Sequence, residues 1–149
     1  MKKSVIVCLF VALFLNLSEG LAQDKNAWRT LAMMKYENEF TSKGPASGDG
    51  KFIAMIEKLD GQTIQLKGYV IPLSGKKAQS HFMFSAYPYG NCFFCGKAGP
   101  ESVVEVFTKD NQKIPFSEKA ITIEGRFEFT SRNTKQVMFS LKEAELIDR

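Results

Sequence analysis

The chain has 149 residues, of which 44% are hydrophobic and 24% charged, with a formal net charge of +4 at pH 7. This length suits one domain with a real core. The charges are interspersed, and beyond residue 22 the only basic doublet is Lys76-Lys77. A nucleic-acid surface would need a denser basic patch, so we expect no nucleic-acid partner.

The first 22 residues have the pattern of a secretory signal peptide. Two lysines precede an apolar run over residues 5–15, and Gly20 and Ala22 place small residues at a cleavage site. The apolar run would be roughly 16 Å long as a helix, against roughly 30 Å of bilayer hydrocarbon. We therefore expect cleavage near Ala22 and a soluble, periplasmic or secreted single domain over residues 23–149, without a transmembrane anchor.

The segment that follows predicts a short helical turn, a strand and a loop. Apolar residues at helical spacing around Trp28 favour the turn. From Met34 to Phe40, apolar residues alternate with charged ones, as in a half-buried strand. Residues 42–50 are rich in turn-forming residues and predict a loop.

The rest of the chain is predicted to be mostly β. After a tight-turn signal at Asp60-Gly61, apolar runs predict strands over residues 63–73, 81–87, 102–107, 120–129 and 137–141. The first and fourth runs carry central glycines, Gly68 and Gly125, which are typical of the bends in small barrels. Five or six short strands with such bends predict a small closed or partly closed barrel with a brief N-terminal helical turn.

Thirteen phenylalanines predict an aromatic core for this barrel. In the run 81–87, Phe82 and Phe84 fall on one face of the strand, and His81, Met83 and Ser85 on the other.

The most distinctive motif is Cys92-Phe93-Phe94-Cys95. Because Cys8 lies in the leader, these are the two cysteines of the mature chain. In an export compartment, a disulfide, a metal site and a redox role are all chemically open to them. A disulfide would close a four-residue loop, which stabilises a protein by only roughly 2 kcal/mol. It would constrain the loop locally and would not cross-link distant parts of the fold.

Metal binding is a sharper alternative, since two thiolates of this spacing are half of a tetrahedral zinc site. The candidates to complete it are His81, which is the only histidine, and Glu101 or Glu105. Such a set favours Zn(II), Cu(I) or an open, exchangeable site over a closed structural zinc site. A lone strand histidine is, however, more often hydrogen-bonded or solvated than a ligand.

A redox role is less favoured. Lys97 is placed to stabilise a thiolate, but the chain lacks the β-α-β context of a thioredoxin-like motif. Conventional enzyme signatures are also missing from the sequence, which has one histidine, no Gly-x-Ser-x-Gly elbow and no Gly-rich phosphate loop. We do not expect an enzyme.

The same loop is also a candidate recognition surface. Tyr87, Tyr89, Phe93 and Phe94 bring four aromatic rings close together, and Lys97 belongs to the same candidate surface. Such a surface suits a protein partner or a lipophilic ligand. The alternative is that at least one phenylalanine folds back to plug one end of the barrel. Plugging is the commoner arrangement, and we expect it here.

Four stretches together resemble a known family. They are similar to small exported bacterial proteins of unknown function, above all those of Bacteroidetes-type bacteria. The stretches are Leu59-Asp60-Gly61, Gly68-Tyr69-Val70-Ile71-Pro72-Leu73, Phe82-Met83-Phe84-Ser85 and the run C-F-F-C-G-K-A-G-P-E-S-V from Cys92. The resemblance extends from about Trp28 to the C-terminus. It implies an OB-like barrel and an export compartment, and brings no activity with it. Some broader relatives look associated with metal transport.

These observations predict an exported binding or accessory protein of mostly β, OB-like fold. Its site is centred on residues 92–101, and its partner is an unknown protein or small ligand. The first alternative is a periplasmic zinc- or copper-binding protein that uses Cys92 and Cys95. The second is a thiol-disulfide redox protein.

Overall fold

The computed structural model describes residues 26–35, 51–130 and 137–148. The predicted signal peptide, the loop 42–50 and most of the strand expected after Met34 lie outside the described residues. The helices are α2 (Trp28–Leu31) and α4 (Lys51–Glu57). The strands are β1 (Thr63–Ile71), β2 (Ala78–Gln79), β3 (His81–Ser85), β4 (Val103–Thr108), β5 (Ile114–Pro115), β6 (Ile121–Phe129) and β7 (Phe139–Asp148).

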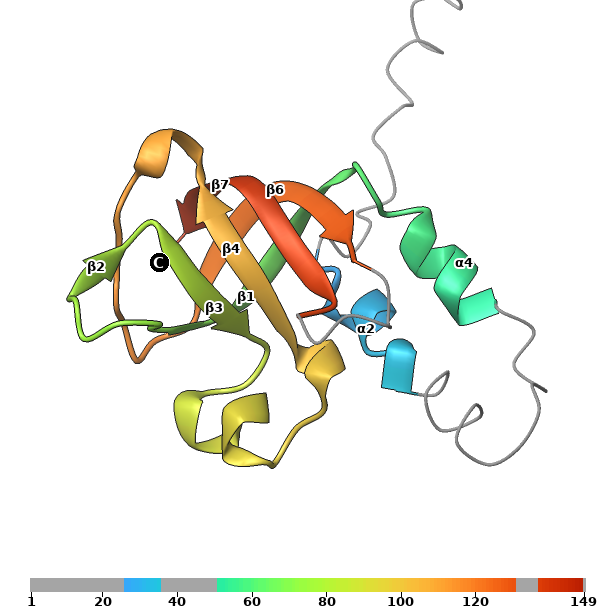
Figure 1. Cartoon of the computed structure of the whole chain (residues 1–149), viewed down its shortest axis with the longest axis horizontal. Helices are drawn as coiled ribbons and strands as arrows, with labels where there is room; N and C mark the ends of the chain where they lie inside the picture. The colour runs from blue at the N-terminus through green and yellow to red at the C-terminus, as the bar shows by residue number, and fades with distance from the viewer. Residues whose placement is uncertain (1–25, 36–50, 131–136, 149) are drawn as a thin grey trace, which may run out of the picture.

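Five of the described strands form a closed barrel in the order β1-β3-β4-β7-β6 (Figure 1). Neighbouring strands are antiparallel except β4 and β7, which pair in parallel. The predicted fold class, a small OB-like barrel with a short N-terminal helical turn, is confirmed. Within the described ranges, no helix is long and apolar enough to cross a membrane.

The barrel interior is filled by alternate residues of each strand. Phe82, Phe84, Phe127 and Phe139 are among its largest fully buried side chains. The rings of Phe82 and Phe84 meet edge to face with centroids 6.4 Å apart, as aromatic pairs prefer. The predicted aromatic core and the predicted faces of β3 are therefore confirmed.

Both predicted glycine bends coincide with changes in strand pairing. β1 pairs with β6 up to Gly68 and with β3 from Tyr69 onward. A Cβ atom on Gly68 would lie 2.3 Å from the backbone oxygen of Ser85, so only glycine lets the strands approach here. Gly125 lies at a register shift between β6 and β7, where β7 carries the left-handed residue Glu143 (φ 51°).

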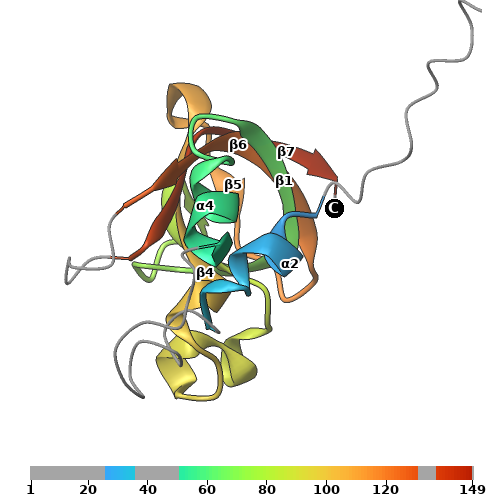
Figure 2. The same ribbon diagram turned by 90° about the vertical axis from the view of Figure 1, so that its right-hand side faces the viewer.

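Helices α2 and α4 lie side by side at one end of the barrel (Figures 1 and 2). Leu31, Met34 and Ile56 extend from this helical layer into the main hydrophobic core and are fully buried. Met34 belongs to a helical segment, so the strand predicted to begin there does not start at that residue.

The sequence patterns missed three elements. Helix α4 was not predicted, and the Asp60-Gly61 turn joins it to β1. The short strands β2 and β5 pair with each other in a separate two-stranded sheet. Strand β7 runs to Asp148, well beyond the predicted end at residue 141.

Candidate functional site

The segment 86–102 connects β3 to β4 and contains the Cys-x-x-Cys motif. It folds as three single 3-10 turns, Tyr89–Asn91, Phe93–Cys95 and Pro100–Ser102. The segment covers the outer face of the barrel near the ends of β1 and β3. Its anchor there is Cys92, which is fully buried in a small second cluster with Ile71, Met83 and Val103.

Both cysteines carry free thiols, but their surroundings differ. Cys92 is buried, whereas Cys95 is exposed and its Sγ donates a hydrogen bond to the Tyr89 carbonyl at 3.0 Å. Local desolvation of the sulfur and the neighbouring Cys92 thiol raise the pKa of Cys95 above its ordinary value, and Lys97 opposes this only in part. A raised pKa lowers the thiolate fraction at neutral pH, which is the opposite of what a redox nucleophile needs.

The structure does not bring the predicted metal ligands together. His81 lies at the start of β3, opposite Phe107, and its ring stacks on Phe107 with centroids 4.4 Å apart. Its Nε2 lies 2.7 Å from Oε1 of Glu105. The Cys loop begins beyond the other end of β3, roughly 13 Å along the strand. In the described part of the chain, no three His, Cys, Asp or Glu residues gather as a metal site would need.

The expectation that Phe93 or Phe94 plugs the barrel is wrong. The two side chains are 38% and 53% exposed and pack edge to face on each other, with centroids 5.5 Å apart. The helical layer of α2 and α4 covers one barrel end with its own apolar side chains. Tyr87 and Tyr89 are exposed as well, as a recognition surface requires.

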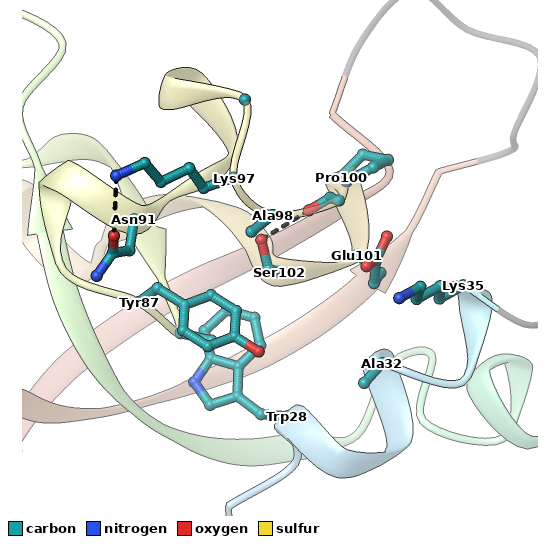
Figure 3. Close-up of a pocket in the computed structure, with 13 residues that line it drawn as sticks. Trp28, Ala32, Lys35, Tyr87, Asn91, Lys97, Ala98, Pro100, Glu101 and Ser102 are labelled. Carbon is teal, nitrogen blue, oxygen red and sulfur yellow. Dashed lines mark hydrogen bonds between the residues drawn. The ribbon is translucent and has the colours of Figure 1, made fainter.

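A pocket of about 860 Å³ lies between α2 and the segment 86–102 (Figure 3). One wall consists of Trp28, Ala32 and Lys35, which follow one another at one-turn spacing on a single face of the helical segment. The opposite wall is the run 96–102, together with Ala86, Tyr87 and Asn91. This run is the part of the motif that follows the second cysteine.

Glu101 is the acidic residue of this pocket. It is nine-tenths buried, with an exposed fraction of 9%. Among the described residues, no hydrogen bond or ion pair reaches its carboxylate. The carboxylate folds back over Gly99, where a Cβ atom would lie 2.2 Å from Oε2. The Ser102 hydroxyl donates to the Gly99 carbonyl at 2.6 Å and holds this turn together.

Two lysines add positive charge to the same pocket. Figure 3 shows Lys35 pointing toward Glu101 from the helical wall, and no ion pair joins the two in the described part of the chain. Lys97 donates a hydrogen bond to Oδ1 of Asn91 at 3.4 Å. The pocket therefore holds both signs of charge, and no ion pair with a described residue neutralises Glu101.

Aromatic side chains complete the walls. Trp28 is held in place because its Nε1 donates to the Lys67 carbonyl at 3.0 Å and its ring stacks on Phe84 with centroids 6.4 Å apart. Tyr87 is half exposed and lines the pocket together with Trp28 (Figure 3). An apolar group in the pocket would have ring faces to pack against.

Of the residues singled out from sequence, Glu101, Tyr87 and Lys97 line this pocket together. The wall supplied by Trp28 and Lys35 was not predicted. The helical spacing of residues 28, 32 and 35 could have indicated a shared face, but no local pattern indicates that this face meets residue 101.

In a comparison with protein families, residues 20–146 match the family described as "Protein of unknown function (DUF3299)". The chain belongs to the DUF3299 family. The predicted resemblance to a family of unknown function is confirmed at this level. Among solved structures, the chain is similar to a DUF3299 family protein (PA4066) from Pseudomonas aeruginosa PAO1. The identity is 18% and the TM-score is 0.45, over 77% of this chain and 81% of that one. Comparison with curated proteins gave no match.

Proposed function

We propose that this DUF3299 protein is an exported, non-enzymatic binding protein that takes up a small ligand in the pocket between α2 and the segment 86–102. The observation that carries the proposal is the Glu101 carboxylate, which is nine-tenths buried, lines the pocket and has no partner among the described residues. A buried charge costs free energy unless a partner satisfies it. A ligand that offers a cation or a hydrogen-bond donor would recover that cost.

Export rests on the signal peptide pattern of residues 1–22, and the Bacteroidetes-type origin rests on the motif. Both stay predictions. Mass spectrometry of the N-terminal peptide, from protein secreted by a bacterial host, tests the first. We expect the mature chain to begin at Gln23, and a retained leader would contradict export.

Zinc or copper binding through Cys92 and Cys95 is the second candidate function. It is favoured by the two free thiols in one turn, and each further ligand would have to come from elsewhere. Metal analysis of the reduced protein tests it. Stoichiometric metal that is lost in both Cys92→Ser and Cys95→Ser would support it, and metal-free protein at micromolar zinc would contradict it.

The pocket proposal is tested by blocking the pocket. Ala98→Leu places a larger side chain in the wall, and Ala54→Leu is the matched control on the exposed face of α4. Saturation-transfer NMR with a panel of small sugars, amines, carboxylates and amino acids compares the two variants with the wild type. We expect compounds that bind the wild type and Ala54→Leu but not Ala98→Leu. A panel without any such compound would overturn the proposal.

A further inference from the structure

Two opposite charges that have no ion-pair partner among the described residues face the same pocket. Glu101 lies on the wall formed by the segment 86–102, and Lys35 approaches it from the helical wall (Figure 3). Lys97 also lines the pocket, but its ammonium group is engaged by Asn91. The exposed Lys35 side chain has no such partner within the described ranges. A ligand that enters between Lys35 and Glu101 therefore meets an ammonium and a carboxylate at once.

This arrangement discriminates between classes of ligand. A simple anion would be repelled by the buried Glu101 carboxylate, which it would desolvate further. Among the described residues that line the pocket, a bare metal ion would find one carboxylate and no thiol or imidazole, together with two repelling lysines. A simple amine would pair with Glu101 but would leave the Lys35 ammonium without a counter-charge from the ligand.

We propose that the pocket binds a zwitterion with an apolar body, of which a free α-amino acid with an aromatic side chain is the simplest case. The ligand ammonium pairs with Glu101 and the ligand carboxylate pairs with Lys35. Both are charge-assisted hydrogen bonds, which are about twice as strong as neutral ones. The apolar body packs against Tyr87 and Trp28. This assignment rests on the binding function proposed above and names its ligand class.

Gly99 is the positioning residue for this site. A Cβ atom at residue 99 would lie within 2.3 Å of both carboxylate oxygens of Glu101. Gly99→Ala would therefore push the carboxylate aside while the charge stays in the pocket. We expect this variant to weaken zwitterion binding without removing any ligand-contacting group.

Three probes of one shape test the charge pattern. L-phenylalanine carries both charges, phenethylamine lacks the carboxylate, and 3-phenylpropanoate lacks the ammonium. Trp28 is the only tryptophan of the chain and lines the pocket, so its fluorescence reports occupancy directly. We expect L-phenylalanine to bind at least about tenfold more tightly than either analogue, because each lost charge pair costs a factor of about ten or more.

Single substitutions show which residue binds the ammonium group of the ligand and which binds its carboxylate. Glu101→Gln should weaken L-phenylalanine binding at least about tenfold and leave 3-phenylpropanoate binding unchanged or tighter. Lys35→Met should weaken L-phenylalanine and leave phenethylamine unchanged. Glu105→Gln and Lys113→Met remove exposed or half-buried charges outside the pocket and should change neither. A misfolded variant would lose binding of both L-phenylalanine and the analogue tested with it. A variant that loses only L-phenylalanine is therefore folded and lacks one specific contact to the ligand.

Equal binding of phenethylamine and L-phenylalanine would overturn the two-charge assignment. If none of the three probes binds while other compounds are blocked by Ala98→Leu, the ligand class is wrong and the binding function stands. If Ala98→Leu blocks no compound at all, the binding function itself fails.

Discussion

The barrel and the segment 86–102 bury their residues in opposite ways. The barrel buries large aromatic side chains such as Phe127 and leaves charged residues outside. The segment exposes its aromatic residues, Phe93 and Phe94, and buries Cys92 and Glu101 instead. In a strand, alternation alone decides which side chain faces inward. In a connecting segment, burial depends on which distant surfaces the chain happens to meet.

Truncating one phenylalanine in each region should give the largest contrast. Phe127→Ala leaves a cavity in the barrel core and should lower the free energy of unfolding by about 3–5 kcal/mol. Phe94→Ala removes a half-exposed ring, and its effect should stay within about 0.5 kcal/mol. Urea unfolding of both variants measures this. A comparable loss in Phe94→Ala would mean that the segment has an apolar core of its own.

The next contrast concerns two glycines. In Gly68→Ala, the new methyl group would meet the Ser85 backbone oxygen and the Phe84 ring, which cannot both retreat, and unfolding should become easier by about 1–3 kcal/mol. Gly90 has open space around its Cα, so Gly90→Ala should be neutral or stabilise the protein by up to about 1 kcal/mol. Thermal unfolding compares the two. A neutral Gly68→Ala would contradict the tight corner of the barrel.

The two cysteines give the same contrast between a buried and an exposed side chain within the segment 86–102. Under reducing conditions, Cys92→Ser buries a hydroxyl among Ile71, Met83 and Val103 and should cost about 1–3 kcal/mol. Cys95→Ser keeps a donor near the Tyr89 carbonyl at an exposed position and should be nearly neutral. Equal losses that appear only under oxidising conditions would instead point to a disulfide between the two cysteines.

The smallest expected effect is a dependence of the free energy of unfolding on pH. Because the pKa of Cys95 is raised, the folded protein holds this proton more tightly than the unfolded chain does. Its contribution to stability is complete below about pH 9 and is lost as the pH rises through the folded pKa. The pKa of Lys109 is raised chiefly by its hydrogen bond to Glu145. Its contribution to stability is therefore also lost as the pH rises through its folded pKa.

Alkylation with iodoacetamide checks this shift. Cys95 in the reduced protein should react slowly at neutral pH and accelerate only above about pH 9, since the thiolate is the nucleophile. Cys92 should be protected until the protein unfolds. Fast alkylation of Cys95 near pH 7 would show a lowered pKa and would revive the redox interpretation.

Most barrel strands could be predicted because their side chains alternate strictly. β1 and β6 begin within one residue of the predicted starts, and both central glycines lie at real corners. Helix α4 was not predicted because its seven residues are too few to show a repeated helical pattern of apolar side chains. The pairing of β2 with β5 joins two-residue strands far apart in the chain, for which no local pattern exists.

For the candidate site, residue types could be predicted but their grouping could not. The sequence drew attention to Cys92–Glu101 as the distinctive loop and named Glu101, Lys97 and Tyr87, which do line one pocket. It also joined His81 to the cysteines, although strand β3 holds His81 at its opposite end. Candidates that lie near one another in the sequence can therefore be separated by the length of a strand.

The sequence by itself determined the barrel, because alternation and glycine placement act locally and select strands, faces and corners. Tertiary structure alone decided that Cys92 would anchor the segment, that Phe93 and Phe94 would face solvent, and that the helical wall of Trp28 and Lys35 would meet Glu101. These outcomes depend on contacts between segments tens of residues apart. Their burial and charge environment exists only once the barrel has closed and helix α2 has packed against its end.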